Sequence, residues 1–297
     1  MPTKRAENIL TRHLKQRPRG ILYHYTSMDA LQSILSNGKL RASDVFYLND
    51  STELTNARHF IQTLVETRLS SDTELSHKAQ QHFGKLADEM NGEVFVASFS
   101  EDGDSLPQWR GYGGDGFGVA FGFLPAAIAA GILEDPVGSV VQGGGGRDFD
   151  FDLHKCVYTS KEKEKLLKDN VDAFVEALKG KHHTIDEKRA GALLGSLGNL
   201  CGPLFKDEGF REEREWRLIV TTLNREFPKR YFRVGKSMLV PYICVDLKTN
   251  YLDFVKEIIV GPTPHPDLAT RSLVKLLRHH ELNRVRVTNS RIPFRAW

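Results

Sequence analysis

The sequence predicts an α+β fold with a mostly antiparallel sheet and flanking helices. Two observations lead to this prediction. Short runs of strand-forming residues alternate with longer segments of helical periodicity. In the last third, strands are expected near 215–221, 229–234, 238–246 and 256–260, with no helical segment between them. Consecutive strands without a helical crossover pair antiparallel, which argues against a regular parallel α/β sheet.

The first third is expected to begin with one strand and continue with helices. Residues 21–26 are strand formers, and Ser27 is a typical N-cap for the amphipathic segment after it. The Asn-Gly dipeptide at 37–38 is a typical helix end, because glycine readily adopts a left-handed conformation. Two further amphipathic helices are expected, at about 54–65 and about 75–90.

The middle of the chain changes to strand periodicity and then returns to helices. Residues 94–99 and 118–121 are expected to be short strands joined by a loop rich in glycine and aromatic residues. Helical patterning returns over 161–180 and 186–206. We therefore expect a helical insertion at about 125–205.

The end of the chain is expected to add a helix over about 266–281 and a strand at 284–288. The glycine run at 143–146 is the only low-complexity break, so residues 1–297 are expected to form a single domain with that insertion. The pattern of the first twenty residues differs from that of a secretory signal.

Composition and charge limit the class of protein. A net charge of +3, from 41 basic and 38 acidic residues, gives no global excess for coating a polyanion. The cysteines are odd in number and lack C-x-x-C spacing, which favours free thiols in a reducing compartment: Cys156, Cys201 and Cys244. No window is as apolar as a membrane span. A cytoplasmic protein without a membrane partner is expected.

The first candidate cluster is the end of the first strand, where His24, Tyr25 and Thr26 precede the capped helix. A histidine at a strand end is well placed to bind a ligand. The alternative is a structural histidine that is satisfied by a backbone carbonyl.

The second candidate cluster joins a strand end to the loop after it. Ser98 and Ser100 alternate on the strand, so both hydroxyls should lie on one face. Trp109 and Tyr112 offer stacking surfaces, and Arg110 offers a cation for phosphate. The alternative is an ordinary hairpin whose aromatic residues belong to the core.

The third candidate cluster is a charged strand start that contains Glu213 and Glu215. On a strand the two carboxylates would project side by side, and their repulsion would raise one pKa, as in an acid/base pair. The alternative is a solvated edge strand whose glutamates pair with Arg211, Arg214 and Arg217. No spacing typical of a zinc site, Walker lysine loop or nucleophile elbow occurs, so no metal is expected.

Four motifs in order support a resemblance to a family. They are YHYTSMDALQSILSNGKLRASDVFYLND, VASFSE with LPQWRGYG and GFGVAFGF, FKDEGFREEREWRLIV, and IIVGP with SRIPFR. From about residue 20 to the C-terminus, the chain resembles bacterial domain-of-unknown-function family 2971. That family's name carries no activity.

A more remote resemblance implies an activity. The strand with His-x-Thr, the capped helix and Asn-Gly-x-Leu are similar to the opening of RNA 2′-phosphotransferases and of DNA-targeting ADP-ribosyltransferase toxins. These proteins share a split sheet in which a first-strand residue binds the NAD ribose. A second strand carries Ser or Thr, and a third carries a catalytic Glu, often as Glu-x-Glu. The familiar Ser-Thr-Ser is Ser-Phe-Ser here, and the insertion at 125–205 has no counterpart.

The resemblance implies roles for these residues with NAD as co-substrate. Glu215 would stabilise the positive charge that develops on the sugar, and Glu213 would take a proton from the acceptor. The cofactor-binding residues would be those of the first two clusters: His24, Tyr25, Thr26, Ser98, Ser100, Trp109, Arg110 and Tyr112. We expect the strands that carry the three clusters to converge around one cleft.

The resemblance leaves the acceptor open among RNA, DNA and protein. The resemblance implies a toxin or phage-defence role, with an antitoxin or regulatory partner. Two other functions remain open. One is a non-catalytic module that binds a nucleotide or peptide. The other is a metal-dependent nuclease built on Asp246-x-Lys248 at a strand end.

Overall fold

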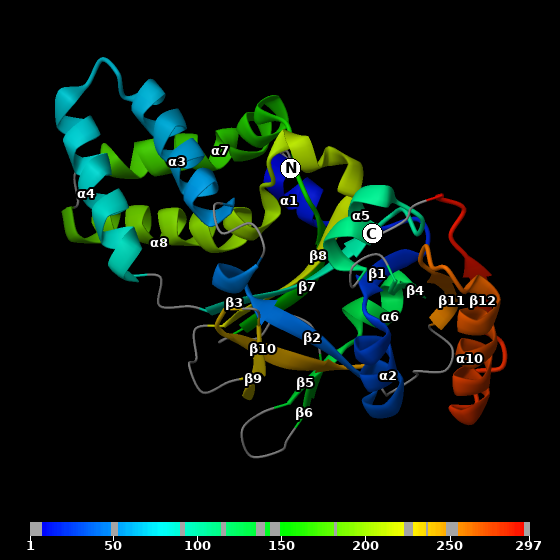
Figure 1. Cartoon of the computed structure of the whole chain (residues 1–297). Coiled ribbons are helices and arrows are strands. Elements are labelled where there is room, and N and C mark those ends of the chain that lie inside the picture. Colours follow the sequence, from blue (N-terminus) through cyan, green and yellow to red (C-terminus); the bar gives the residue numbers. More distant parts are fainter. Residues whose placement is uncertain are drawn as a thin grey trace, which may run out of the picture.

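A computed structural model of the chain describes ten segments (Figure 1). They are residues 8–48, 53–89, 93–113, 117–134, 140–142, 149–180, 183–222, 228–235, 237–247 and 255–293. The glycine run at 143–146 and residue Lys248 lie outside the described residues.

The strands form one 12-stranded sheet in the described part of the chain. They are β1 (Leu22–Thr26), β2 (Lys39–Asp44), β3 (Glu93–Ser100), β4 (Val119–Phe123), β5 (Ile132–Glu134), β6 (Val140–Gln142), β7 (Phe149–Lys155), β8 (Glu215–Thr222), β9 (Arg230–Val234), β10 (Leu239–Asp246), β11 (Val255–Val260) and β12 (Arg286–Asn289). The order along the main path is β12-β11-β4-β1-β3-β2-β10-β5-β6, with β8 and β7 branching from β3 and β9 from β10. Only β11 and β12 pair in parallel among the described strands, so the prediction of an α+β fold with a mostly antiparallel sheet is confirmed.

Strand β3 is the branch point of the sheet. One edge pairs with β8 over its full length, from Glu93 opposite Thr222 to Ser100 opposite Glu215. The other edge is shared, because β1 meets β3 only at Ser100 while β2 meets it at Phe95. The sheet therefore divides between β1 and β2.

Helices cover both faces of this sheet. The α-helices are α1 (Ile9–Leu14), α2 (Met28–Asn37), α3 (Glu53–Arg68), α4 (Thr73–Glu89), α5 (Leu106–Tyr112), α6 (Pro125–Ala129), α7 (Ser160–Leu178), α8 (His183–Cys201) and α10 (Pro266–His279). Short 3-10 helices are η1 (Val45–Tyr47), η2 (Gly202–Leu204) and η3 (Glu208–Glu213). Helices α3, α4, α7 and α8 gather on one side, and α2 and α10 lie on the other (Figure 1).

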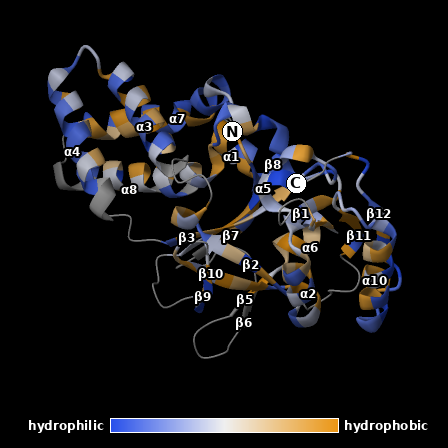
Figure 2. Ribbon diagram, in the orientation of Figure 1, coloured by the Kyte–Doolittle hydropathy of each residue, from blue (hydrophilic) through white to orange (hydrophobic). Residues whose placement is uncertain are grey.

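Alternation along β3 separates two hydrophobic cores. Phe95 and Phe99 belong to the core shared with α2, α6 and α10. Val94 and Val96 belong to the core shared with α3, α4, α7 and α8. Because alternate strand residues point to opposite faces, β3 is buried on both sides. Figure 2 shows the mixed hydrophobic and hydrophilic positions along α3, α7 and α10 that such packing requires.

The predicted ends of α2 are confirmed. The side chain of Ser27 accepts a hydrogen bond from the backbone N–H of Ala30. Gly38 adopts φ 66° and ends the helix in the left-handed conformation.

Two expectations about the middle of the chain need correction. The loop expected between β3 and β4 contains helix α5, which was missed because Gly111 lowers helix propensity in a short segment. The segment at 125–205, expected to be helical, also contains β5, β6 and β7. Strand β7 buries Phe151 and Leu153 while Asp152 between them is partly exposed, which is the alternation of a half-buried strand.

Candidate functional site

Glu213 and Glu215 lie on either side of a tight turn. Glu213 is the last residue of η3, and Glu215 is the first residue of β8. Arg214 between them adopts φ 45° and ψ 48°, a left-handed conformation that is uncommon for a residue other than glycine. The turn brings the two carboxylates together, so their proximity does not come from strand alternation as expected.

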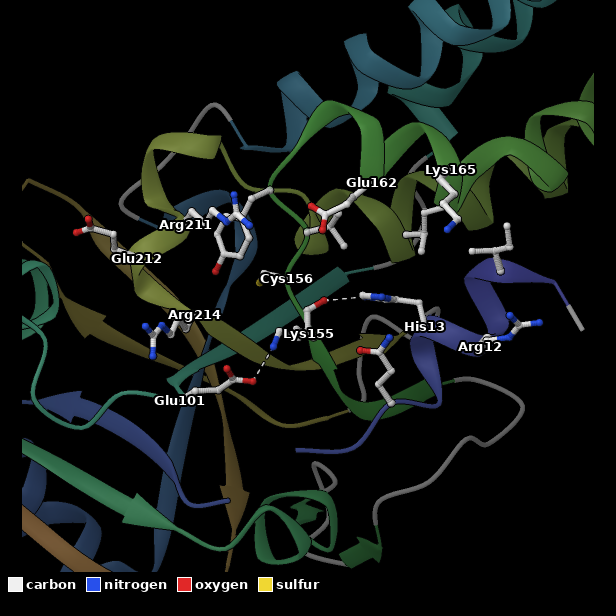
Figure 3. A pocket seen from close by; sticks show the side chains of 15 residues that line it. Arg12, His13, Glu101, Lys155, Cys156, Glu162, Lys165, Arg211, Glu212 and Arg214 are labelled. Carbon is white, nitrogen blue, oxygen red and sulfur yellow. Dashed lines mark hydrogen bonds and ion pairs between the residues drawn. The ribbon is translucent and has the colours of Figure 1, made fainter. Parts of the chain in front are cut away.

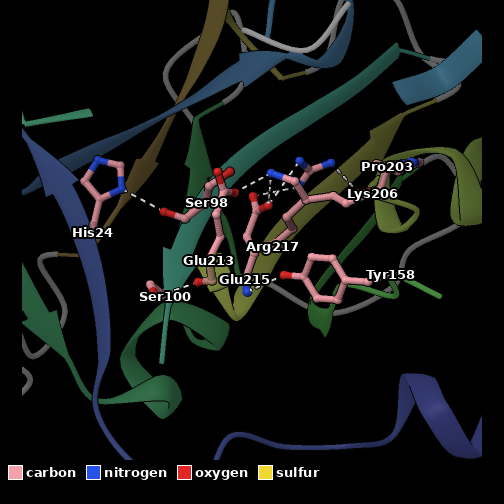
Figure 4. A network of polar contacts seen from close by, with 9 residues as sticks. All are labelled: His24, Ser98, Ser100, Tyr158, Pro203, Lys206, Glu213, Glu215 and Arg217. Carbon is pink, nitrogen blue, oxygen red and sulfur yellow. Dashed lines mark hydrogen bonds and ion pairs between the residues drawn. The ribbon is translucent and has the colours of Figure 1, made fainter. Parts of the chain in front are cut away.

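The two glutamates belong to a buried network with Lys206 and Arg217. The residues are 3% exposed at Lys206, 7% at Glu213, 3% at Glu215 and 2% at Arg217. Lys206 Nζ lies 2.5 Å from Glu213 Oε2 and 2.8 Å from Glu215 Oε2. Arg217 Nε donates to Glu215 Oε1 at 2.8 Å (Figure 4). Two carboxylates and two cations thus share one buried site.

Backbone contacts hold this network in place. Arg217 also donates to the carbonyl of Pro203 at 2.6 Å. The backbone N–H of Glu215 donates to the Tyr158 hydroxyl at 2.7 Å. These bonds come from the segments at the ends of α8 and β7, so distant parts of the chain fix the position of Glu215.

The network moves the pKa values of the two carboxyl groups in opposite directions. Burial alone would raise the pKa of Glu215, but Arg217 and Lys206 together lower it to about 2. Burial raises the pKa of Glu213, and the attraction of Lys206 only partly offsets this. Burial would lower the pKa of Lys206, but the two glutamates raise it overall. Glu215 is therefore a permanent anion at neutral pH, and Glu213 is the more easily protonated carboxyl.

The solvated edge strand considered from sequence is not what the structure shows. Strand β8 lies between β3 and β7, so it is an interior strand. The glutamates pair with Lys206 and Arg217, whereas Arg211 and Arg214 point elsewhere. Lys206 was missed because a single lysine upstream of the turn gives no signal in the sequence.

Ser98 and Ser100 share one face of β3, as expected from their alternation, and Glu215 on β8 lies on the same face of the sheet. Ser100 is directly opposite Glu215 in the sheet, and Ser98 is opposite Arg217. The Ser100 hydroxyl donates to the carbonyl of Glu213 at 2.7 Å and accepts from the N–H of Asp102 at 3.1 Å. Ser100 therefore holds the turn that carries Glu213.

His24 extends from the opposite face of the sheet. Tyr23 pairs with Ser100, so the side chain of Tyr23 is the one on the face of Glu215, and its neighbour His24 points away. The His24 ring packs against Phe99, with centroids 5.7 Å apart. His24 Nδ1 lies 2.9 Å from the carbonyl of Ser98, so it must be the protonated nitrogen and the donor.

His24 thus bridges β1 and β3 where the sheet divides. This placement fits the structural histidine considered as the alternative for the first cluster. The structure does not bring His24 and the glutamates to one face. Burial also lowers the pKa of His24, which favours the neutral ring. Thr26 shares the face of His24 and is buried.

Tyr25 and Trp109 form a small core beneath α5. Their rings meet edge to face with centroids 4.7 Å apart, and Trp109 is 0% exposed. Tyr25 donates to the carbonyl of Asp102 at 2.7 Å, and Trp109 Nε1 donates to Asp104 Oδ1 at 2.9 Å. Trp109 is therefore a core residue, and the expectation that it stacks on a ligand is wrong for this structure.

Tyr112 is the residue of the second cluster that lies beside the glutamates. It is 37% exposed at the end of α5, which contacts η3. Burial and the neighbouring Glu213 raise the pKa of Tyr112 to about 12. Arg110 lies on the exposed side of the same helix. Tyr112 is thus the most exposed of the aromatic side chains named from the sequence next to the buried network.

A pocket of about 820 Å³, shown in Figure 3, adjoins the network, because Arg214 of the glutamate turn lines it. We call it the basic pocket. Its lining residues are Ile9, Arg12, His13, Gln16, Glu101, Lys155, Cys156, Val157, Tyr158, Glu162, Lys165, Leu166, Arg211, Glu212 and Arg214. Tyr158 connects it to the network through the bond to Glu215. The pocket could not be predicted from the sequence, because its walls come from segments far apart in the chain.

The site lies within a segment that matches a known family. Residues 108–218 match the family model described as "Protein of unknown function (DUF2971)". The DUF2971 match begins in α5 and ends in β8, so it includes the glutamate turn, Lys206 and Arg217. It supports the resemblance to this family over that part of the chain.

No curated protein and no solved structure matches the chain. No helix in the described segments is long and apolar enough to cross a membrane. Among the described residues, no group of three or more His, Cys, Asp or Glu side chains could hold a metal ion.

Proposed function

We propose that the protein is an NAD-dependent ADP-ribosyltransferase that modifies a macromolecule. The observation that carries the proposal is the Glu213–Glu215 pair in one buried site, where burial raises the pKa of Glu213 and the cations Arg217 and Lys206 lower that of Glu215. Pairs of carboxyl groups that are held in different protonation states commonly divide the work of charge stabilisation and proton transfer. DUF2971 itself contributes no activity to this proposal.

The chemistry of the reaction fits this division. Breaking the bond between nicotinamide and ribose leaves positive charge on the sugar. A fixed anion near the sugar lowers the activation barrier of this step. Glu215 remains ionised far below neutral pH and suits this role. Glu213 gains and loses a proton more readily and suits the transfer of a proton from the acceptor.

The proposed reaction requires that the sugar of NAD can reach the two carboxylates. Both glutamates are engaged with Lys206, and Tyr112 is the partly exposed side chain beside them. We infer that Tyr112 marks the side from which the sugar approaches. Ser100 positions Glu213, and His24 positions β3 through its hydrogen bond across the point where the sheet divides. Neither side chain therefore needs to touch the substrate.

The test measures nicotinamide release from NAD by the purified full-length chain. We expect release by the wild type and at least a hundredfold lower rate for Glu215→Gln, because the anion is lost. Glu213→Gln should reduce label transfer to the acceptor more than nicotinamide release, because water needs less help from a base.

A matched control separates lost chemistry from lost stability. Glu257 is also a buried glutamate with an arginine partner, Arg286, but it lies on β11 away from the network. Glu257→Gln should lower the melting temperature and retain nicotinamide release below that temperature. Wild-type release by Glu215→Gln, or no release by wild type with any acceptor fraction, would refute the proposal.

The acceptor and the setting belong to the same proposal. Candidate acceptors are RNA, DNA and protein, and a toxin or phage-defence protein in the cytoplasm, held by an antitoxin, is the setting that the resemblance suggests. Mass spectrometry of nucleic acid and protein from expressing cells identifies the acceptor by the added ADP-ribose.

A non-catalytic binding module is the second candidate. The observation that favours it is that Lys206 and Arg217 contact both carboxylate oxygens of Glu215 while the basic pocket is open. This module would bind NAD or another nucleotide without releasing nicotinamide. The nuclease alternative rests on Asp246, at the end of β10, and on Lys248, which lies outside the described residues. Activity in a chelator would exclude it.

A further inference from the structure

The basic pocket has the size and position of a separate ligand site. Its volume of about 820 Å³ falls within the range of small-molecule sites in proteins. Its walls come from α1, α7, η3 and the end of β7. Neither Glu213 nor Glu215 lines it, so the following inference does not rest on the proposed activity.

Cations face the pocket from opposite sides. Figure 3 shows Arg211 and Arg214 on one side, Arg12 and Lys165 on the other, and Lys155 between them. The Arg and Lys residues of the lining number five, and the glutamates number three: Glu101, Glu162 and Glu212. The pocket therefore carries an excess of positive charge, although the chain as a whole is nearly neutral.

Three of these cations make no direct ionic contact among the described residues, although Arg214 and Arg211 attract Glu101 and Glu162 from a longer distance. The side chains of Arg211, Arg214 and Lys165 form no salt bridge or hydrogen bond there. Lys155, by contrast, pairs with Glu101 at 2.7 Å. Exposed cations that face one another across a cavity repel, and an anion placed between them relieves this repulsion.

The backbone conformation of Arg214 also indicates that the pocket binds an anion. Arg214 is one of two non-glycine residues with positive φ in the described part of the chain. This conformation costs about 1–2 kcal/mol for a residue with a Cβ atom. Here it directs the guanidinium into the pocket while Glu213 and Glu215 turn to the network. A strained arginine, where glycine would fit, indicates a use for the side chain.

The remaining lining residues indicate an organic ligand. Ile9, Val157 and Leu166 supply apolar surface, and Tyr158 adds an aromatic ring. Guanidinium groups bind phosphate through paired hydrogen bonds. We infer that the basic pocket binds a nucleoside diphosphate, with the phosphates at Arg211 and Arg214 and the base against the apolar wall.

Titration calorimetry with ADP on the full-length chain tests this inference. We expect ADP to bind, with adenosine and inorganic pyrophosphate each at least tenfold weaker. Arg211→Ala and Arg214→Gly should each raise the Kd of ADP about tenfold or more, as lost charged hydrogen bonds do. Arg271→Ala, which removes an exposed arginine on α10, should leave the Kd unchanged.

Arg214→Gly separates lost binding from lost folding. Glycine adopts the observed φ without strain, so the melting temperature should not fall while binding weakens. Failure of ADP to bind, or a wild-type Kd in both Arg211→Ala and Arg214→Gly, would overturn the inference. If inorganic pyrophosphate bound as tightly as ADP, the inference that the nucleotide base lies against the apolar wall would be overturned. None of these results depends on nicotinamide release, so this inference and the proposed activity fail separately.

Discussion

The buried surroundings of Glu215 favour its ionised form. Its pKa falls from 4.5 to about 2 in the folded chain. A carboxyl group with a lowered folded pKa stabilises the fold above its unfolded pKa, and this contribution is lost as the pH falls toward 2. The shift corresponds to about 3 kcal/mol at neutral pH.

Glu215→Gln should therefore destabilise the fold more than Glu213→Gln. We expect a loss of about 3–5 kcal/mol at pH 7 for Glu215→Gln, because Lys206 and Arg217 lose a shared partner inside the protein. The loss for Glu213→Gln should be smaller, because its ionised form is disfavoured by burial. Urea denaturation at pH 7 and pH 3 measures both, and the difference between the two variants should be smaller at pH 3, because the pH is then approaching the folded pKa of Glu215 of about 2. An equal loss at pH 7 would contradict this account.

His24 gives a second dependence on pH. Its folded pKa lies below the ordinary value of 6.5, so folding favours the neutral ring and stability falls as the pH drops below about 6.5. His24→Asn keeps a donor near the carbonyl of Ser98 and removes the titration. The variant should show a flatter melting temperature between pH 7 and pH 5. The same slope in both proteins would show that His24 is not the group responsible.

At the residue scale, the sequence predicted which face of a strand a side chain takes better than it predicted the contacts that the side chain makes. Alternation correctly placed the Ser98 and Ser100 hydroxyls on one face of their strand, and the pairing with β8 shows that Glu215 shares it. It could not predict that Arg214 would adopt a left-handed conformation, because the local sequence has no glycine at that turn. It also could not find Lys206, since only tertiary packing brings this lysine to the glutamates.

At the scale of elements, α5 is the clearest example of a segment fixed by its contacts. Asp104, just before α5, accepts hydrogen bonds from Trp109 Nε1 at 2.9 Å, from the Ser290 hydroxyl at 2.5 Å and from the backbone N–H of Arg291 at 2.8 Å. One carboxylate thus joins α5 to the segment after β12.

Asp104→Ala should loosen that segment. We expect faster deuterium uptake at residues 290–292 and a lower melting temperature, because the Ser290 hydroxyl and the Arg291 N–H lose their acceptor. Asp104→Asn keeps one acceptor oxygen and should give a smaller effect. Asp267→Ala, which removes an exposed aspartate on α10, serves as the control. Unchanged uptake at 290–292 in Asp104→Ala would mean that other contacts hold the segment.

Regular elements were easier to predict than those that depend on distant partners. The caps at Ser27 and Gly38 correctly gave the ends of α2, because capping is a local interaction. Strand β7 was missed although Asp150, Asp152 and His154 alternate with its apolar residues, because its partner β8 lies about sixty positions away.

At the scale of the molecule, four helices form one layer against the sheet. Phe174 on α7 is fully buried and meets the rings of His82 and Phe83 on α4. Arg68 on α3 pairs with Asp172 on α7 at 3.1 Å, but both side chains are largely exposed. Packing therefore holds this layer together more than the ion pair does.

Phe174→Ala should cost about 3–5 kcal/mol of unfolding free energy. Arg68→Ala should cost less than about 1 kcal/mol, because the exposed pair is screened by solvent. Chemical denaturation of the two variants compares these values. A larger loss for Arg68→Ala would indicate that the layer depends on charge.

The pairing of β2 with β10 has a consequence for synthesis. Strand β2 (Lys39–Asp44) is synthesised before its partner β10 (Leu239–Asp246), which follows about 200 positions later in the chain. At about 5–20 residues per second, a ribosome needs about 10–40 s to reach them. During that interval, the edge of β2 that β10 later covers has no partner and can pair with another chain. The nascent protein should therefore depend on chaperones until its last third emerges.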